Sequence, residues 1–84
     1  MNSPNSIFDE YDGLRKKFQH EYAGVSLPEL DMDGSELLIA ILKCELDIKK
    51  LTKSEWQFER YFKPVIMRKI QSVEGHMTKL RMEA

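Results

Sequence analysis

The chain has 84 residues, of which 42% are hydrophobic and 32% charged, and its formal net charge is −1. This length and composition indicate one soluble globular domain with a thin core, and they exclude a disordered chain. The longest uninterrupted apolar run, from Leu37 to Leu42, is far shorter than the roughly 20 residues that a membrane-spanning helix needs.

The first predicted helix covers about residues 5–23. Apolar side chains recur there at spacings of three and four residues, at Ile7, Tyr11, Leu14 and Phe18. The start signal lies either near Ser3 or near Ser6, because both residue positions suit the beginning of a helix. Gly24 is expected to end the helix in the left-handed backbone conformation.

The segment LPELDMDGSELL, Leu27–Leu38, resembles the first half of a calcium loop of the EF-hand kind, since acids alternate in it before Gly34. With Gly34 at position 6 of such a loop, Ala40 stands where a bidentate glutamate is needed. The same letters also form a capping box, with Asp33 as N-cap and Glu36 as third helical residue. We therefore expect a helix start here and no metal site.

The second predicted helix covers about residues 34–50. One apolar row follows the seam spacing of packed helices, and a second row runs beside it: Leu37, Ile41, Cys44, Ile48 and Leu51, then Leu38, Leu42 and Leu46. A face this broad indicates a central helix with two neighbours. Cys44 is the single cysteine, and its place on the seam favours a buried residue in a protein of a reducing compartment. No export signal is evident at the N-terminus, and we expect a cytoplasmic protein.

The third predicted helix covers about residues 53–82 and begins at a capping box of Thr52 with Glu55. Pro64 interrupts it, because proline lacks a backbone N–H and crowds the preceding turn. A kinked continuous helix is favoured there over two separate ones. The fold class is therefore all-α: a small three-helix bundle whose long C-terminal helix is kinked or split near Pro64.

Chemical motifs are missing from the sequence. It has no G-x-S-x-G, no glycine-rich phosphate loop and no H-E-x-x-H. Cys44, His20 and His76 are too scattered for a zinc site, and both histidines are predicted to be solvent-facing helix residues. We expect no enzyme, no cofactor, no metal and no membrane contact.

The third helix carries more apolar surface than one antiparallel neighbour can cover, together with tryptophan, tyrosine and arginine, which anchor many protein interfaces. The sequence therefore predicts a non-catalytic interaction, regulatory or accessory protein. Its partner would be another protein or a second copy of the chain, giving a hetero-complex or a homodimer. The candidate partner-binding residues are Trp56, Arg60, Tyr61, Lys63, Met67, Ile70 and Met77.

The alternative is a nucleic-acid-binding regulator. Residues 1–48 carry ten acids and four bases, whereas residues 49–84 carry nine bases and four acids. A basic strip from Lys49 to Lys69 could neutralise phosphates, and the short connection at Leu51–Thr52 would suit a helix-turn-helix. The same charge asymmetry would also arise in a bundle whose halves neutralise each other.

Overall fold

A computed structural model describes residues 6–83, and all regular structure within that range is helical. The predicted all-α class is therefore confirmed. The alternative helix start near Ser3 lies outside the described residues. The elements in chain order are α1 (Ser6–Tyr22), the 3₁₀ turn η1 (Leu27–Glu29), α2 (Met32–Thr52), α3 (Glu55–Gln57), the π-helical turn η2 (Phe58–Phe62) and α4 (Lys63–Glu83).

The last three elements follow one another without a break and form one long C-terminal helix with a bend of π-helical geometry. The Lys63 backbone N–H donates to the Phe58 carbonyl five residues earlier, in place of the usual four. This wide turn ends directly before Pro64, which has no N–H to donate and whose ring would crowd the carbonyl four residues back. The prediction of a continuous helix bent near Pro64 is confirmed.

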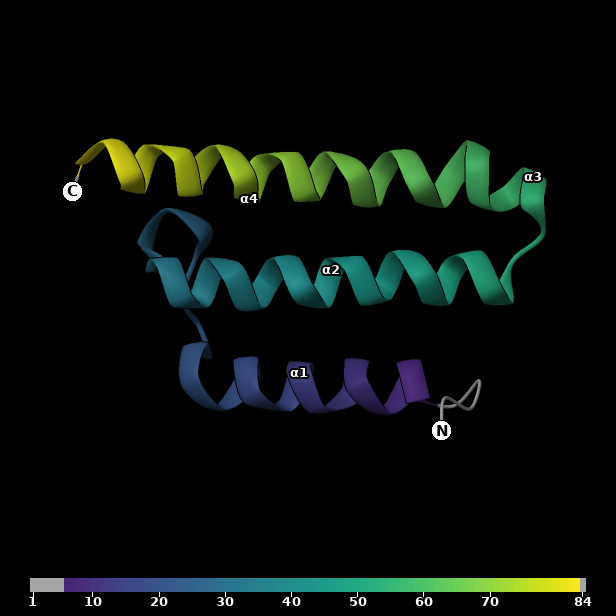
Figure 1. Cartoon of the computed structure of the whole chain (residues 1–84), viewed down its shortest axis with the longest axis horizontal. Helices are drawn as coiled ribbons and strands as arrows, with labels where there is room; N and C mark the ends of the chain where they lie inside the picture. The colour runs from purple at the N-terminus through teal and green to yellow at the C-terminus, as the bar shows by residue number, and fades with distance from the viewer. Residues whose placement is uncertain (1–5, 84) are drawn as a thin grey trace.

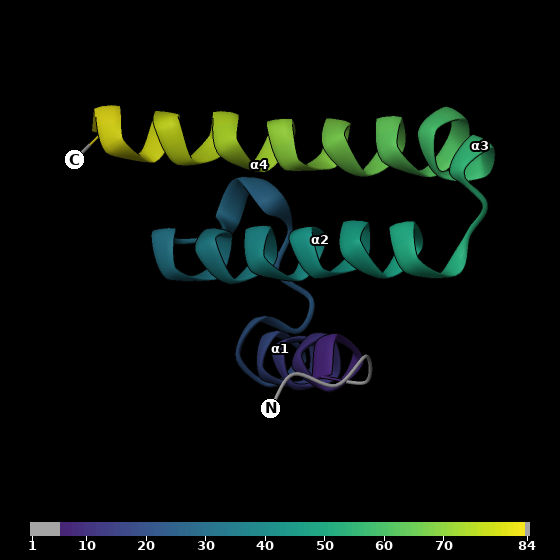
Figure 2. The same cartoon turned by 45° about the vertical axis from the view of Figure 1, so that its right-hand side comes forward.

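Helix α2 lies between α1 and α4 (Figure 1), and it packs along both of them. Helices α2 and α4 run antiparallel side by side in both views. Turning the molecule shows α1 nearly end-on while α2 and α4 still lie across the view, so α1 crosses α2 obliquely (Figure 2). The bundle thus has α2 in the middle, with α4 antiparallel to it on one side and α1 crossing it on the other.

The two apolar rows of α2 face its two neighbours, as the breadth of its apolar face predicted, except that Leu51 at the end of the first row is 65% exposed. The second row packs against α4, where Leu42 joins the buried core and Leu38 and Leu46 cover its edge. On the first row, Ile41 and Cys44 are 7% and 6% exposed. Burial raises the pKa of the Cys44 thiol, and the nearby carboxylates of Glu10 on α1 and Asp47 raise it further. Because Glu10 belongs to α1, this row faces α1.

The ends of the helices differ from the predicted capping boxes. Gly24 does take the left-handed conformation, with a φ of 78°, just past the end of α1. The N-cap of α2 is Asp31, not Asp33, because the Asp31 carboxylate accepts from the Gly34 backbone N–H. The predicted box of Thr52 with Glu55 is also wrong: α2 continues through Thr52, and Ser54 caps α3.

Asp31 caps α2 because contacts from α1 fix it in place. Its Oδ1 atom accepts from the Gly34 N–H at 2.7 Å and from the Tyr22 hydroxyl at 3.1 Å. Its backbone carbonyl accepts from the Ser35 hydroxyl at 2.8 Å, and Ser35 is fully buried. One carboxylate therefore ties the end of α1 to the start of α2, which local sequence alone does not specify.

His76 joins α4 to the same corner. Its Nε2 atom lies 2.8 Å from the backbone carbonyl of Leu30, a residue only 2% exposed. Because a carbonyl oxygen can only accept, Nε2 carries the proton and donates. The prediction that His76 faces solvent is therefore wrong; the side chain is half-buried and holds the η1 segment against α4.

Replacing His76 by alanine is expected to lower the free energy of unfolding by about 1–2 kcal/mol, because the backbone carbonyl of the buried Leu30 loses its donor. Replacement by glutamine, whose amide can donate, is expected to recover part of that loss. The exposed His20 on α1 provides the matched control, since surface substitutions stay within about 0.5 kcal/mol. Urea denaturation of the three variants checks this, and equal effects of His76→Ala and His20→Ala would contradict it.

Candidate interaction surface

The seven residues predicted to bind a partner fall into three environments. Trp56 and Tyr61 are 62% and 55% exposed, and Arg60 and Lys63 are also exposed. Met67 is half-buried against the edge of the core. The exposed four lie together on α3, η2 and the first residue of α4, at one end of the molecule.

Ile70 and Met77 do not belong to an exposed surface. They are 5% and 9% exposed and belong to the cluster that α4 forms with α2, which consists of Leu42, Ile66, Ile70, Val73 and Met77. The sequence placed them in an apolar line along the third helix, but it did not show that α2 covers this line. Their prediction as surface contacts is therefore wrong in this fold.

Trp56 and Tyr61 contact each other edge to face, with ring centroids 5.3 Å apart and an angle of 88° between the rings. They are five residues apart, whereas side chains that meet along a regular α-helix are three or four apart. Tyr61 belongs to the π-helical turn η2, and the wider turn brings it into contact with Trp56 five residues earlier. The bend before Pro64 thus organises this aromatic pair.

The same turn keeps other aromatic side chains on the core side. Phe58 is only 5% exposed, and Phe62 is half-buried against the α2–α4 core. The aromatic residues of this stretch are therefore divided between two sides of the helix. Phe58 and Phe62 anchor it to the bundle, while Trp56 and Tyr61 stay accessible to solvent.

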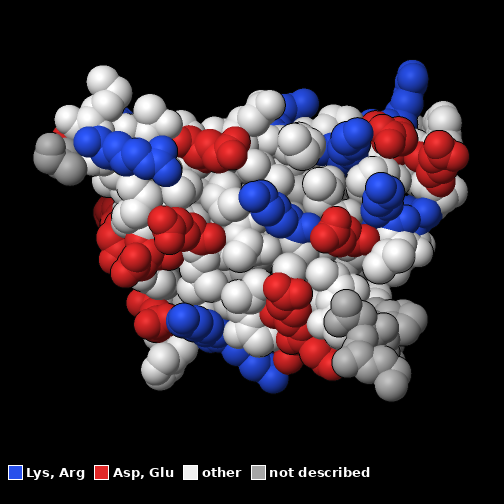
Figure 3. Space-filling model, viewed as in Figure 1, with Lys and Arg blue, Asp and Glu red and all other residues white. Residues whose placement is uncertain are grey.

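Charged residues of both signs surround the aromatic pair. Glu55, Trp56, Glu59 and Arg60 line a shallow depression on the outer side of the helix. The Lys63 ammonium lies 3.4 Å from the Glu59 carboxylate, and both side chains are about half exposed, so this ion pair adds little to stability. At the α3 end of the view in Figure 3, acidic and basic side chains lie side by side. Glu55 and Glu59 were not among the predicted site residues, although their spacing of four already put them on one helix face.

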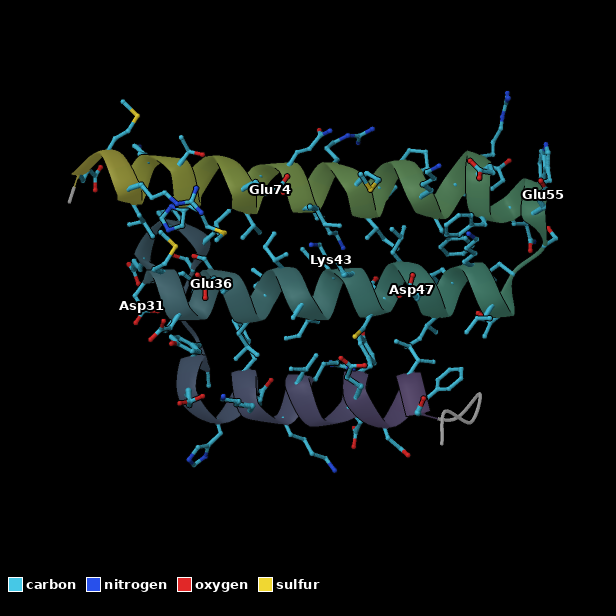
Figure 4. All side chains as sticks on the ribbon, viewed as in Figure 1. Asp31, Glu36, Lys43, Asp47, Glu55 and Glu74 are labelled. Carbon is cyan, nitrogen blue, oxygen red and sulfur yellow. The ribbon has the colours of Figure 1, made fainter. Side chains whose placement is uncertain are left out.

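We call this set of residues the Trp56 surface; it comprises Glu55, Trp56, Glu59, Arg60, Tyr61 and Lys63. It lies at the opposite end of α2 from the Asp31 cap, as the labelled positions of Asp31 and Glu55 show (Figure 4). The Trp56 surface is therefore separate from the corner that links α1 to α2.

The basic strip from Lys49 to Lys69 does not form a helix-turn-helix. Helices α2 and α4 make an antiparallel hairpin, whereas the two helices of that motif cross at a steep angle. Two of the lysines are also engaged locally: the ammonium groups of Lys49 and Lys53 lie 5.0 Å and 5.4 Å from the centre of the Phe62 ring. These are distances at which a cation is attracted to an aromatic face.

The acidic segment before α2 has a structural role in this fold, since Asp31 is occupied by the helix cap and by the Tyr22 hydroxyl. Among residues 6–83, no three His, Cys, Asp or Glu side chains gather as they would around a metal ion. No helix in that range combines the length and the apolar character that crossing a bilayer requires.

Comparison of the chain with protein-family models, with curated proteins and with solved structures finds no match. We therefore infer the function of the chain from the chemistry of the described residues, and above all from the Trp56 surface.

Proposed function

We propose that this protein is a small non-catalytic interaction or regulatory protein that binds another protein chain through the Trp56 surface. The observation that carries this proposal is the aromatic pair of Trp56 and Tyr61. Two large aromatic side chains are more than half exposed, yet they are fixed against each other on a helix rather than packed into the core.

Such a pair suits binding for an energetic reason. Burying an exposed tryptophan and tyrosine removes much apolar area from water, and both side chains lose little conformational entropy because the helix and their mutual contact already restrict them. Arg60 lies beside Trp56 at the rim of the same depression. Tryptophan, tyrosine and arginine are the residue types that dominate the energetics of protein interfaces.

The π-helical turn adds a second line of support. Such turns are rare inside α-helices, and they occur frequently at functional sites. Here the turn has a specific effect, because it brings side chains five residues apart into contact. Pro64 favours the turn, so we regard Pro64 as the positioning residue of the Trp56 surface.

Replacing Trp56 by alanine is expected to reduce recovery of the bound partner at least about tenfold when the full chain is used to capture proteins from native extract. The fold should persist, because the side chain is 62% exposed. Met82→Ala is the matched control: it truncates another exposed apolar side chain, 82% exposed, at the far end of α4. Quantitative mass spectrometry of chemically crosslinked complexes provides the measurement.

Pro64→Ala refines this experiment. Alanine has the backbone N–H that proline lacks, so the wide turn is no longer needed, while every side chain of the Trp56 surface stays in the sequence. The variant is therefore expected to weaken partner capture only by changing the positions of these side chains. Equal partner recovery by wild type, Trp56→Ala and Met82→Ala would overturn the proposed function.

Nucleic-acid binding is the second candidate and has less support. The chain holds nine bases in residues 49–84, but acids lie among them at Glu55 and Glu59, where phosphates would have to approach. Salt-dependent retardation of random duplex DNA by the purified chain would favour this candidate instead.

A further inference from the structure

We propose that the partner of the Trp56 surface is a second copy of this chain, docked antiparallel about a two-fold axis that passes close to Trp56 and Tyr61. This inference rests on the proposed function, because it names the partner of the same surface. It follows from the charges of that surface, from their order along the helix and from the absence of a neighbouring helix, among the described residues, on the outer side of α3 and η2.

The charges of the Trp56 surface are balanced. Two acids, Glu55 and Glu59, stand against two bases, Arg60 and Lys63. A uniformly acidic or basic partner would leave half of these groups beside a like charge, which costs free energy at an interface. A partner with the same number of acids and bases on one helix face avoids this, and a second copy has that composition.

The order of the charges specifies the orientation. Both acids precede both bases along the helix, so one end of the surface is acidic and the other basic. In a two-fold interface the same patch serves both subunits, and contacts occur in symmetric pairs. An antiparallel arrangement therefore brings the acids of each copy to the bases of the other, whereas a parallel one would bring like charges together.

The aromatic side chains occupy the middle of this arrangement. Trp56 and Arg60 line one depression together, and Tyr61 contacts Trp56 from the adjoining side of the helix. Val65, 46% exposed, lies in α4 one turn beyond Tyr61 and extends the apolar surface along that helix. Two such surfaces placed face to face bury both aromatic pairs at their centre, with the charges at the rim, which is the usual anatomy of a specific interface.

The position of the surface leaves room for a second copy. The segment containing α3 and η2 lies at one end of the stack, and α2 is its neighbour only on the inner side, in both views (Figures 1 and 2). Helix α1 lies on the opposite side of α2. The outer side of α3 and η2 is therefore open along the direction from which a reversed copy would approach.

Sedimentation equilibrium of the full chain tests this directly. The chain mass is 9.9 kDa, and the weight-average mass is expected to rise to twice that value as concentration increases. Trp56→Ala should raise the dimer dissociation constant at least about tenfold, while Met82→Ala should leave it unchanged. Tryptophan emission of the wild type should shift to longer wavelength on dilution, because Trp56 is the only tryptophan and becomes exposed.

A charge exchange identifies the surface without removing the aromatic side chains. The double variant Glu55→Lys with Glu59→Lys makes the surface wholly basic, and the double variant Arg60→Glu with Lys63→Glu makes it wholly acidic. Each variant alone is expected to be monomeric, and an equimolar mixture is expected to form a heterodimer tighter than the wild-type dimer. Circular dichroism of each variant verifies that it is folded, and reversal of Arg68, an exposed base of α4 outside the surface, is the control.

Each outcome decides the inference. A wild-type mass of 9.9 kDa at every concentration up to about 1 mM overturns the homodimer. A dimer that Trp56→Ala and the charge exchange leave unchanged overturns the assignment of this surface as its interface. If the chain is monomeric but captures another protein in a Trp56-dependent manner, only the homodimer inference fails. If Trp56-dependent capture is also missing, the proposed function fails with it.

Discussion

Replacing Ile70 by alanine is expected to lower the free energy of unfolding by about 3 kcal/mol, because it removes a 5% exposed side chain from the contact between α2 and α4 and leaves a cavity. For a domain of this size, a loss of about 3 kcal/mol corresponds to a fall in melting temperature of roughly 15 °C. Small domains are only marginally stable, so this variant is expected to be partly unfolded near 37 °C. Differential scanning calorimetry measures the effect.

Met82→Ala is the matched control for Ile70→Ala. Met82 lies on the same helix and is also a large apolar residue, but its side chain is 82% exposed. Its truncation should change stability by no more than about 0.5 kcal/mol. If both variants melted at the wild-type temperature, and Ile70→Ala instead abolished partner binding, then Ile70 would be a surface contact and the packing of α4 on α2 described above would be incorrect.

Replacing Gly34 by alanine is expected to destabilise the protein by about 1–3 kcal/mol, the usual range for overpacking a filled site. A Cβ atom at this position would lie 2.8 Å from Cε1 of Tyr22 and 2.9 Å from Cδ2 of Leu30. Leu30 is buried, and moving Tyr22 would break the hydrogen bond from its hydroxyl to Asp31. The close approach of Tyr22 and Leu30 to the start of α2 therefore requires glycine at position 34.

Gly75→Ala is expected to act in the opposite direction. Nothing lies within 4 Å of a Cβ atom at position 75, and the residue is exposed in the interior of α4. Alanine there should stabilise the helix by up to about 1 kcal/mol. Urea denaturation of both variants tests the opposite signs. In a Tyr22→Ala background the loss of stability caused by Gly34→Ala should be smaller, since the nearest obstructing atom belongs to Tyr22. An unchanged loss of stability would show that Leu30 alone obstructs the added Cβ atom.

The two glycines show that residue type does not predict the effect of a substitution in this chain. Both are helical glycines, and an isolated helix would gain from alanine at either position. The difference arises because Tyr22 and Leu30 fill the space beside Gly34, whereas solvent surrounds Gly75. Stability effects here depend on packing between elements that are distant along the chain.

Local sequence determined most of the secondary structure of this protein. Apolar residues at spacings of three and four predicted helices over about residues 5–23, 34–50 and 53–82, and the structure has α1 at Ser6–Tyr22, α2 at Met32–Thr52 and a C-terminal helix from Glu55 to Glu83. The missing N–H of Pro64 predicted the bend, and the breadth of the apolar face of α2 predicted two neighbours. These features follow from backbone geometry and from the period of the pattern, both of which are local.

Tertiary structure alone decided where the helices are capped and which apolar residues remain exposed. Asp31 is the N-cap of α2 because the Tyr22 hydroxyl and the packing around Gly34 hold it there, and His76 faces inward because its Nε2–H donates a hydrogen bond to the Leu30 carbonyl. Helical periodicity shows which side chains share a face, but not which neighbour covers that face. Ile70 is therefore buried by α2, whereas the side chain of Trp56, on the same long helix, remains 62% exposed.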